Sequence, residues 1–160
     1  MTDKSIEVAP VAHVVGGKTK VADDYWGGNR SIIRIDRSFP AECTAGLAEF
    51  SHLEIVFHFH LEAAEFNPGA RSPRNNSAWP QVGLFGHRNM ARPNRLGVSR
   101  CRLIEVDGLD LHVKELDAVD GTPVIDIKPW FPDFGPRGEV RTPAWPGEML
   151  ADYFAEPHTK

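Results

Sequence analysis

The sequence predicts a mainly β protein, a small closed or nearly closed β-barrel of about seven short strands with one or two short helices. Its 13 prolines and 14 glycines divide the chain into short segments, which favours strands joined by turns over long helices. Several segments alternate apolar and polar residues, as half-buried strands do. A chain of 160 residues with 41% hydrophobic content can bury one core, so we expect a single domain over residues 1–160.

Four short runs rich in β-branched or aromatic residues are predicted strands: residues 5–15, 30–36, 52–60 and 81–86. Residues 101–130 hold three more segments, separated by Asp107-Gly108 and Asp120-Gly121. Asp-Gly pairs are hairpin signals because both residues tolerate positive φ in a type I′ turn. We therefore expect a three-strand meander over residues 101–130.

Helical signals are few. Residues 43–53 place apolar side chains at three- and four-residue intervals, which predicts one short helix. The proline-rich stretch 131–147 is expected to be an irregular connection, and residues 148–154 a terminal helical turn.

The charge distribution excludes a protein that coats nucleic acid by bulk charge, because the net charge is −4. A nucleic-acid partner would need a local basic patch, and residues 81–100 provide one with Arg88, Arg92, Arg95 and Arg100. Guanidinium groups suit phosphates, carboxylates or a nucleic-acid backbone. The alternative is a solvated loop whose arginines pair with acidic neighbours.

Cysteine and hydropathy patterns point to the cytoplasm. Cys43 and Cys101 are far apart and have no CxxC companion, so neither a disulfide framework nor a four-cysteine zinc site is predicted. The N-terminus has no long apolar run, and no stretch approaches the roughly 20 apolar residues of a membrane span. We expect no membrane association.

His58 and His60 lie two apart in a predicted strand and should share one face, as metal-binding imidazoles often do. A third ligand would have to come from His52, Cys43 or Glu62. Because zinc requires ligands that this sequence does not group, we predict no metal site, and expect one histidine to line a pocket.

Two acidic pairs have alternative interpretations. Asp117 and Asp120 are either simple turn formers or hold a polar ligand where a strand ends. Asp126 and Lys128 alternate with apolar neighbours, so they share the face opposite Ile125; they form either a salt bridge or one wall of a site.

The four tryptophans, Trp26, Trp79, Trp130 and Trp145, lie near glycine or proline. Rings in such loops can stack on bases, or they can plug a small barrel. The sequence has no Walker loop, GxGxxG, GxSxG or HExxH motif, so four common enzyme classes lose support.

Three stretches together resemble the TsaA-like family: GLAEFSHLEIVFHFH (46–60), VGLFGHRNMARPNRLGVSR (82–100) and LDAVDGTPVIDIKPW (116–130). The family blocks run approximately GL-EFSHLW-LF-FH, GVFATRSP-RPNPIGLS and DLVDGTPV-DIKPY, in the same order. The resemblance implies a small β-barrel, normally a homodimer, that binds S-adenosyl-L-methionine. The reaction that it implies is methyl transfer to N6 of N6-threonylcarbamoyladenosine beside the tRNA anticodon.

The resemblance also implies site residues. Cofactor-binding positions would be Trp26, Gly27, Gly28, His60, Leu61, Arg88, Val98, Asp117, Ala118, Val119 and Asp120. Substrate-binding positions would be Arg92, Arg95, Lys128 and Trp130. Methyl transfer needs in-line positioning of donor and acceptor in a dry pocket, without a metal or covalent nucleophile. Asn94 or Asp126 is expected to accept a hydrogen bond from the substrate amine.

The chain also departs from the family. His87, Arg88, Asn89 and Met90 replace Thr-Arg-Ser-Pro, and Arg95 replaces the second proline of RPNP. Val14–Lys18 replaces an Ile-Arg-Ser-Pro block, and the C-terminal extension of longer members is not expected. Two alternatives therefore stay open: the same cofactor with a small-molecule acceptor, or a non-catalytic module that senses S-adenosyl-L-methionine or binds RNA.

Overall fold

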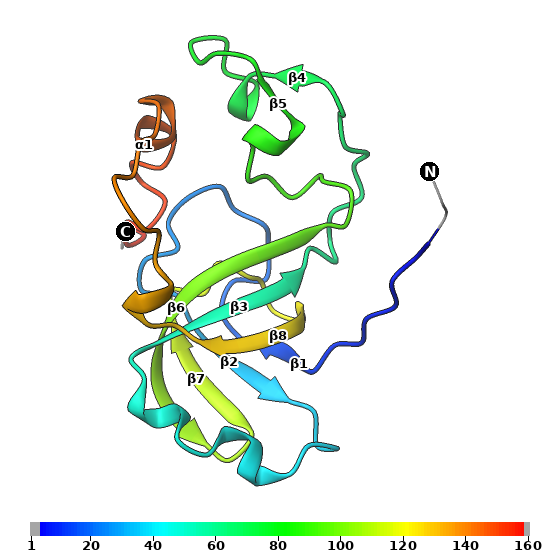
Figure 1. Cartoon of the computed structure of the whole chain (residues 1–160), viewed down its shortest axis with the longest axis vertical. Helices are drawn as coiled ribbons and strands as arrows, with labels where there is room; N and C mark the ends of the chain where they lie inside the picture. Colours follow the sequence, from blue (N-terminus) through cyan, green and yellow to red (C-terminus); the bar gives the residue numbers. More distant parts are fainter. Residues whose placement is uncertain (1–3, 159–160) are drawn as a thin grey trace.

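The computed structural model describes residues 4–158 and confirms the β-barrel (Figure 1). Its strands are β1 (Ala12–Val15), β2 (Arg30–Ile35), β3 (His52–His58), β6 (Leu96–Asp107), β7 (Asp110–Lys114) and β8 (Pro123–Pro129). They close in the order β1-β2-β7-β6-β3-β8, and neighbouring strands are antiparallel. The predicted runs 30–36 and 52–60 therefore match barrel strands closely.

Alternation along the strands separates the core from the outer wall. In β3, Leu53, Ile55 and Phe57 are buried, whereas the residues between them are partly exposed. The inward residues pack with Leu111, Val124 and others in one core cluster. Burial of this apolar set stabilises the barrel, and the outward set is free for other roles.

A small lobe stands above the barrel in Figure 1. It holds the two-stranded sheet of β4 (Ala70–Arg71) and β5 (Val82–Gly83), with 3-10 turns η3 (Pro73–Asn75) and η4 (Leu84–Gly86). The predicted strand 81–86 is thus only two residues long and lies outside the barrel, because the chain turns at Leu84.

The predicted three-strand meander is wrong. β6 and β7 do form a hairpin, but β8 pairs with β1 and β3 instead of β7. The segment around Asp120-Gly121 crosses the end of the barrel, where Gly121 N–H donates to Val14 O at 2.7 Å. The first turn also differs from type I′, because its two central residues are Gly108 and Leu109, and only Gly108, with a φ of 60°, has a positive φ.

Two other expectations need correction. Residues 43–53 form no single helix but two 3-10 helices, η1 (Ala41–Thr44) and η2 (Leu47–Glu49), separated by Gly46 with a φ of 77°. Of residues 5–15 only β1 is a strand, since Pro10 has no N–H to extend the ladder.

The C-terminal part holds η5 (Pro132–Phe134) and one α-helix, α1 (Trp145–Met149). The helix begins three residues earlier than expected, with Pro146 in its first turn, where a missing N–H costs nothing. The chain then continues as turns and a bend over residues 151–155, which contact residues 25–27. Within residues 4–158, no helix has the length and hydropathy needed to cross a bilayer.

Candidate functional site

The Asp117–Asp120 turn lies against the segment Val14–Lys18 at one end of the barrel. Asp120 Oδ1 accepts a hydrogen bond from Gly16 N–H at 2.7 Å, and Asp120 N–H donates to Lys18 O at 2.8 Å. The segment that replaces the family's N-terminal block is therefore fixed directly to the predicted ligand-binding turn.

Asn29 connects this turn to the predicted Trp26–Gly28 segment. Its Nδ2 donates to Leu116 O at 3.1 Å, and its Oδ1 accepts from Lys18 N–H at 3.2 Å. The Lys18 ammonium lies 5.3 Å from the Trp26 ring centroid. The sequence motifs did not indicate a site role for Asn29 or Lys18. The one local signal for Asn29 is its place as a polar residue directly after Gly27-Gly28.

Residues 152–155, which we call the C-terminal strap, cover the outer side of the Trp26–Gly28 segment. The N–H groups of Tyr25, Trp26 and Gly27 donate to the carbonyls of Asp152, Tyr153 and Ala155 at 3.1, 2.8 and 3.2 Å. A Cβ on Gly27 would overlap the Phe154 carbonyl oxygen, so only glycine allows this approach.

Tyr153 connects the C-terminal strap to the predicted ligand-binding turn. Its hydroxyl donates to Asp117 Oδ2 at 2.5 Å, while Asp117 Oδ1 is buried and has no partner among the described residues. Burial and the neighbouring Asp117 carboxylate raise the pKa of Tyr153. The charges of Arg74 and Arg88 oppose that rise.

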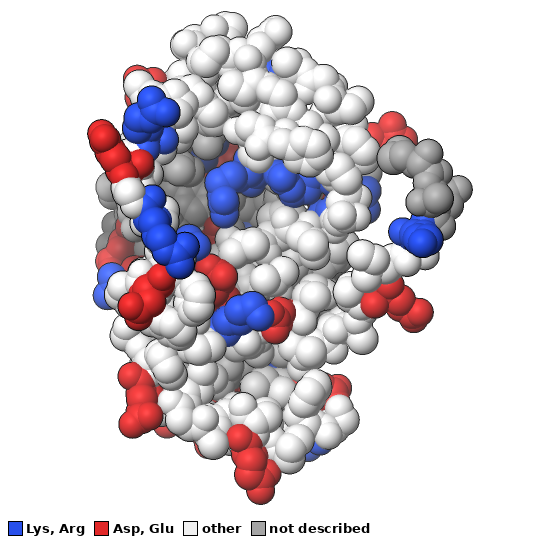
Figure 2. Space-filling view, viewed as in Figure 1, with Lys and Arg blue, Asp and Glu red and all other residues white. Residues whose placement is uncertain are grey.

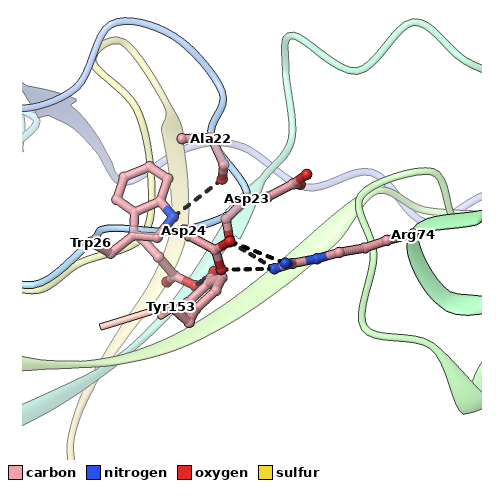
Figure 3. Close-up of polar contacts among 7 residues, drawn as sticks. Ala22, Asp23, Asp24, Trp26, Arg74 and Tyr153 are labelled. Carbon is pink, nitrogen blue, oxygen red and sulfur yellow. Dashed lines mark hydrogen bonds and ion pairs between the residues drawn. The ribbon is translucent and has the colours of Figure 1, made fainter. Parts of the chain in front are cut away.

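A bidentate ion pair ties the same region to the lobe (Figure 3). Arg74 Nη1 and Nη2 donate to the Asp24 carboxylate at 3.1 and 3.0 Å, and Nη2 also donates to Asp23 O at 2.9 Å. Trp26 Nε1 donates to Ala22 O at 3.2 Å in the same loop. The loop that contains Ala22–Trp26, the lobe and the C-terminal strap therefore meet at one end of the barrel.

His60 lies at this end, but not as predicted. β3 ends at His58, and His60 N–H donates to His58 O at 2.9 Å in a tight turn, so the two imidazoles do not share a strand face. The His60 Nε2 atom is 3.6 Å from the Cβ position of Gly121. Burial and the nearby His58 and His13 lower the pKa of His60.

The remaining predicted cofactor residues differ in exposure. Leu61 is exposed, whereas Ala118 and Val119 are buried. Val98 lies on the outer wall of β6, opposite Val56. No group of three or more His, Cys, Asp or Glu residues among residues 4–158 could hold a metal ion.

Asp126 and Lys128 also lie on this outer wall, because they pair with the outward residues Val56 and Glu54 of β3. Lys128 Nζ is 2.6 Å from Asp126 Oδ2, so the salt bridge that the sequence allowed is present. Arg100 pairs with Glu54 at 3.0 Å and lies 5.9 Å from the centroid of the Trp130 ring.

Arg92 and Arg95 face a hollow of about 480 Å³ between the lobe and the barrel. It is lined by Glu65, Phe66, Pro68, Arg92, Pro93, Asn94 and Arg95. Arg92 Nη1 donates to His87 O at 2.9 Å, and neither arginine has a carboxylate partner among the described residues. Figure 2 shows Lys and Arg side chains gathered in the crease beneath the lobe.

Arg95 gives this turn a conformation that the family's proline could not adopt. Its φ is 48°, and its N–H donates to Arg92 O at 3.1 Å. Arg95 O in turn accepts from Phe59 N–H at 2.8 Å, next to His60. The basic hollow and the predicted cofactor residues therefore meet at the same end of the barrel.

Comparison with known proteins identifies the family. A model of the tRNA-methyltransferase O N-terminal domain matches residues 23–135. The chain belongs to this family. The resemblance of the three sequence blocks is thereby confirmed, and so is the expected fold, because a crystal structure of TrmO superposes with a TM-score of 0.71 at 26% identity, covering 87% of this chain and 64% of that one.

Relatives of this tRNA-methyltransferase O family carry two kinds of name. The tRNA (adenine(37)-N6)-methyltransferase of Escherichia coli strain K12 is 43% identical over 98 residues, which is 58% of this chain and 41% of that enzyme. A probable S-adenosyl-L-methionine-binding protein of Pyrococcus abyssi is 40% identical over 95 residues, 59% of this chain and 50% of that protein. This chain therefore spans half or less of these two relatives.

A third relative matches over nearly its whole length. The probable S-adenosyl-L-methionine-binding protein of Methanothermobacter thermautotrophicus is 37% identical over 145 residues, covering 86% of this chain and 99% of that protein.

Proposed function

We propose that this chain is an S-adenosyl-L-methionine-dependent methyltransferase that methylates N6 of an adenosine in tRNA, with N6-threonylcarbamoyladenosine beside the anticodon as the leading substrate. The names of the relatives support both the cofactor and the tRNA. The structural observation that carries the proposal is the Phe59–Arg95 hydrogen bond, which joins the basic hollow to the His60 end of the barrel.

The residues at this end fit a sulfonium cofactor. Asp117 Oδ1 is a buried acceptor with no partner within residues 4–158, suited to a hydroxyl or ammonium donor. The planar guanidinium of Arg88 suits a carboxylate. The proposed cofactor set is Trp26, Gly27, Gly28, His60, Leu61, Arg88, Val98 and the Asp117–Asp120 turn. When bound, S-adenosyl-L-methionine supplies an electrophilic methyl group.

RNA would approach the face formed by the hollow and the outer wall of β3, β6 and β8. The Arg95 guanidinium and the part of the Arg92 guanidinium that does not bond His87 O and Asn89 O can meet phosphate. Lys128 on β8 and Trp130 directly after it extend the same face. Exposed Phe66 offers a stacking surface inside the hollow. The proposal also includes a cytoplasmic homodimer, which rests on the family resemblance.

Asn94 and Asp126 are the candidates for orienting the acceptor amine. Asn94 lines the hollow, and the Asp126 carboxylate lies on the outer wall. Either oxygen can accept a hydrogen bond from N6–H and so direct the nitrogen lone pair, because methyl transfer depends mainly on positioning. No metal or nucleophile is needed for such a step.

Transfer of labelled methyl groups from S-adenosyl-L-methionine to tRNA tests this proposal. The tRNA would come from a strain that lacks its own enzyme of this type. We expect the full chain to incorporate label into N6 of adenosine, and Asn94→Ala or Asp126→Asn to lose most of this activity. Asp110→Asn is the control and should change it little, because the Asp110 carboxylate on β7 is already paired with Arg34.

The alternatives predict different results. Incorporation into a low-molecular-weight acceptor but not into tRNA would support the small-molecule methyltransferase. Cofactor binding without any methyl transfer, by protein shown to be folded, would support a module that senses S-adenosyl-L-methionine or binds RNA.

A further inference from the structure

We infer that Tyr153 is a positioning residue of the proposed cofactor site and that the C-terminal strap is a lid that closes over the bound cofactor. The inference rests on the proposed function. It adds a part of the chain that neither the sequence motifs nor the family match to residues 23–135 includes.

The first support is the way in which the C-terminal strap covers the Trp26–Gly28 segment. Three consecutive N–H groups of Tyr25, Trp26 and Gly27 point at strap carbonyls. Trp26 and Gly27 are buried beneath the strap, whereas Phe154 on the strap is 55% exposed. The closed strap therefore shuts off the outer side of this segment, so a ligand enters past this side only when the strap lifts, and the strap can bond the segment again afterwards.

The second support is the state of the Asp117 carboxylate. The Tyr153 hydroxyl occupies Oδ2, and Oδ1 is buried with no donor among the described residues. A buried carboxylate oxygen without a partner is unfavourable, and a ligand donor that reaches it removes the cost. The closed strap thus holds Asp117 ready for one further hydrogen bond.

The third support is the anchoring of the segment before the strap. Trp79 Nε1 in the lobe donates to Glu148 Oε2 of α1 at 2.8 Å. On the other side, Arg74 of the lobe holds Asp24, next to Tyr25. These lobe contacts hold α1, which precedes the strap, and the Asp24 loop, against which the strap packs, so the strap can lift while both stay in place.

The acidic and basic groups around the strap agree with a cofactor that carries both charges. The Tyr153 hydroxyl donates to Asp117, and the positive charges of Arg74 and Arg88 act on the pKa of that hydroxyl. On the strap side, the Glu156 carboxylate is 3.5 Å from the Cβ position of Gly28. A zwitterionic ligand with a sulfonium centre would therefore meet opposite charges on both sides.

Two matched pairs of variants test the inference in the full chain. Tyr153→Phe removes the hydroxyl that holds Asp117, and Tyr25→Phe is its control at the other tyrosine. Gly27→Ala forces the strap away from the loop, and Gly147→Ala, with open space around its Cβ in α1, is the glycine control. Thermal unfolding and circular dichroism confirm that each variant is folded.

The readouts are the dissociation constant of S-adenosyl-L-methionine by calorimetry and hydrogen exchange of the Tyr25, Trp26 and Gly27 amides. We expect Tyr153→Phe to raise the dissociation constant by about ten-fold or more, because it removes one charge-assisted hydrogen bond. Gly27→Ala should raise it as well, because the added methyl group holds the strap away from the loop. The controls stay near wild type. Saturating cofactor should slow exchange of these amides in the wild type.

Unchanged or tighter cofactor binding by Tyr153→Phe and Gly27→Ala would overturn the inference, as would amide exchange that does not respond to cofactor. Either result, with wild-type binding intact, refutes the lid and leaves the proposed function standing. A folded wild type that binds no cofactor refutes both.

Discussion

The Phe154 carbonyl oxygen occupies the space that a Cβ atom on Gly27 would need. This contact joins the C-terminal strap to a loop more than a hundred residues earlier in the chain. It also explains why Gly27 is buried although it lies in a loop that the family resemblance assigns to ligand binding.

Replacing Gly27 should destabilise the fold locally. We expect Gly27→Ala to lower the free energy of unfolding by about 1–3 kcal/mol, because the added methyl group meets backbone that cannot rotate away. Urea unfolding measures the change. Gly147→Ala, in the helix and with free space around it, should be neutral or slightly stabilising; equal effects of the two substitutions would contradict the close approach.

The Arg74–Asp24 pair should hold the lobe to the barrel. Its side chains are 27% and 24% exposed, less than the Arg34–Asp110 pair at 48% and 28%. Arg74→Gln should therefore cost about 1 kcal/mol and speed proteolysis of the lobe, whereas Arg34→Gln should cost less. Limited proteolysis compares the two; a lobe equally resistant in Arg74→Gln would count against this role.

The two cysteines should differ in reactivity. Cys43 is exposed and Cys101 is buried, and burial raises the pKa of the Cys101 thiol to about 12. A thiol reagent should therefore modify Cys43 rapidly in the native protein and Cys101 only after unfolding. Rapid native-state modification of two thiols would show that the β6 wall opens more readily than its packing indicates.

Cys101 should also make the free energy of unfolding fall as the pH rises through the alkaline range. Its pKa is higher in the folded state than the ordinary value of 9.0, so the unfolded chain loses this proton first. Between pH 9 and about pH 12 the free energy of unfolding should fall by about 1.4 kcal/mol per pH unit from this group. Urea unfolding of Cys101→Ala over the same range should lack this slope, and a parallel decline in both proteins would contradict it.

Arg92 and Arg95 should act on RNA and not on the cofactor. Each free guanidinium that meets a phosphate adds about one to the slope of binding against salt concentration. We expect Arg95→Gln to weaken tRNA binding and reduce this slope, with the affinity for S-adenosyl-L-methionine unchanged. Arg34→Gln is the control, because Arg34 on β2 is paired with Asp110 on β7. If Arg95→Gln and Arg34→Gln reduced the salt slope equally, the effect would reflect only the change in net charge.

The barrel was predictable because the alternation of apolar and polar residues that marks its strands is a local sequence signal. Alternating apolar and polar residues in 30–36 and 52–60 predicted two barrel strands, and Gly108 predicted a hairpin that does form. The partner of β8 was not predictable by the same means, since Asp120-Gly121 resembles a hairpin turn whether the next strand pairs with β7 or crosses to β1.

The family motifs named candidate site residues within three stretches of the chain, but they could not indicate where distant segments meet. Asn29 bonds to Leu116, 87 residues away, and Tyr153 bonds to Asp117, 36 residues away. Nothing in the local sequence around Tyr153 distinguishes it from a surface tyrosine of a terminal turn. The prediction that His58 and His60 share one strand face was wrong for a local reason, because the turn after His58 interrupts the two-residue alternation of the strand.

Calorimetric titration of S-adenosyl-L-methionine into the full chain, beside Arg88→Ala, tests the central claim most directly, with any copurified ligand identified by mass spectrometry. We expect saturable binding at one site per chain in the wild type and a clear loss of affinity in Arg88→Ala. Absence of binding and of copurified cofactor in a folded wild-type protein would contradict the claim that this end of the barrel is a cofactor site.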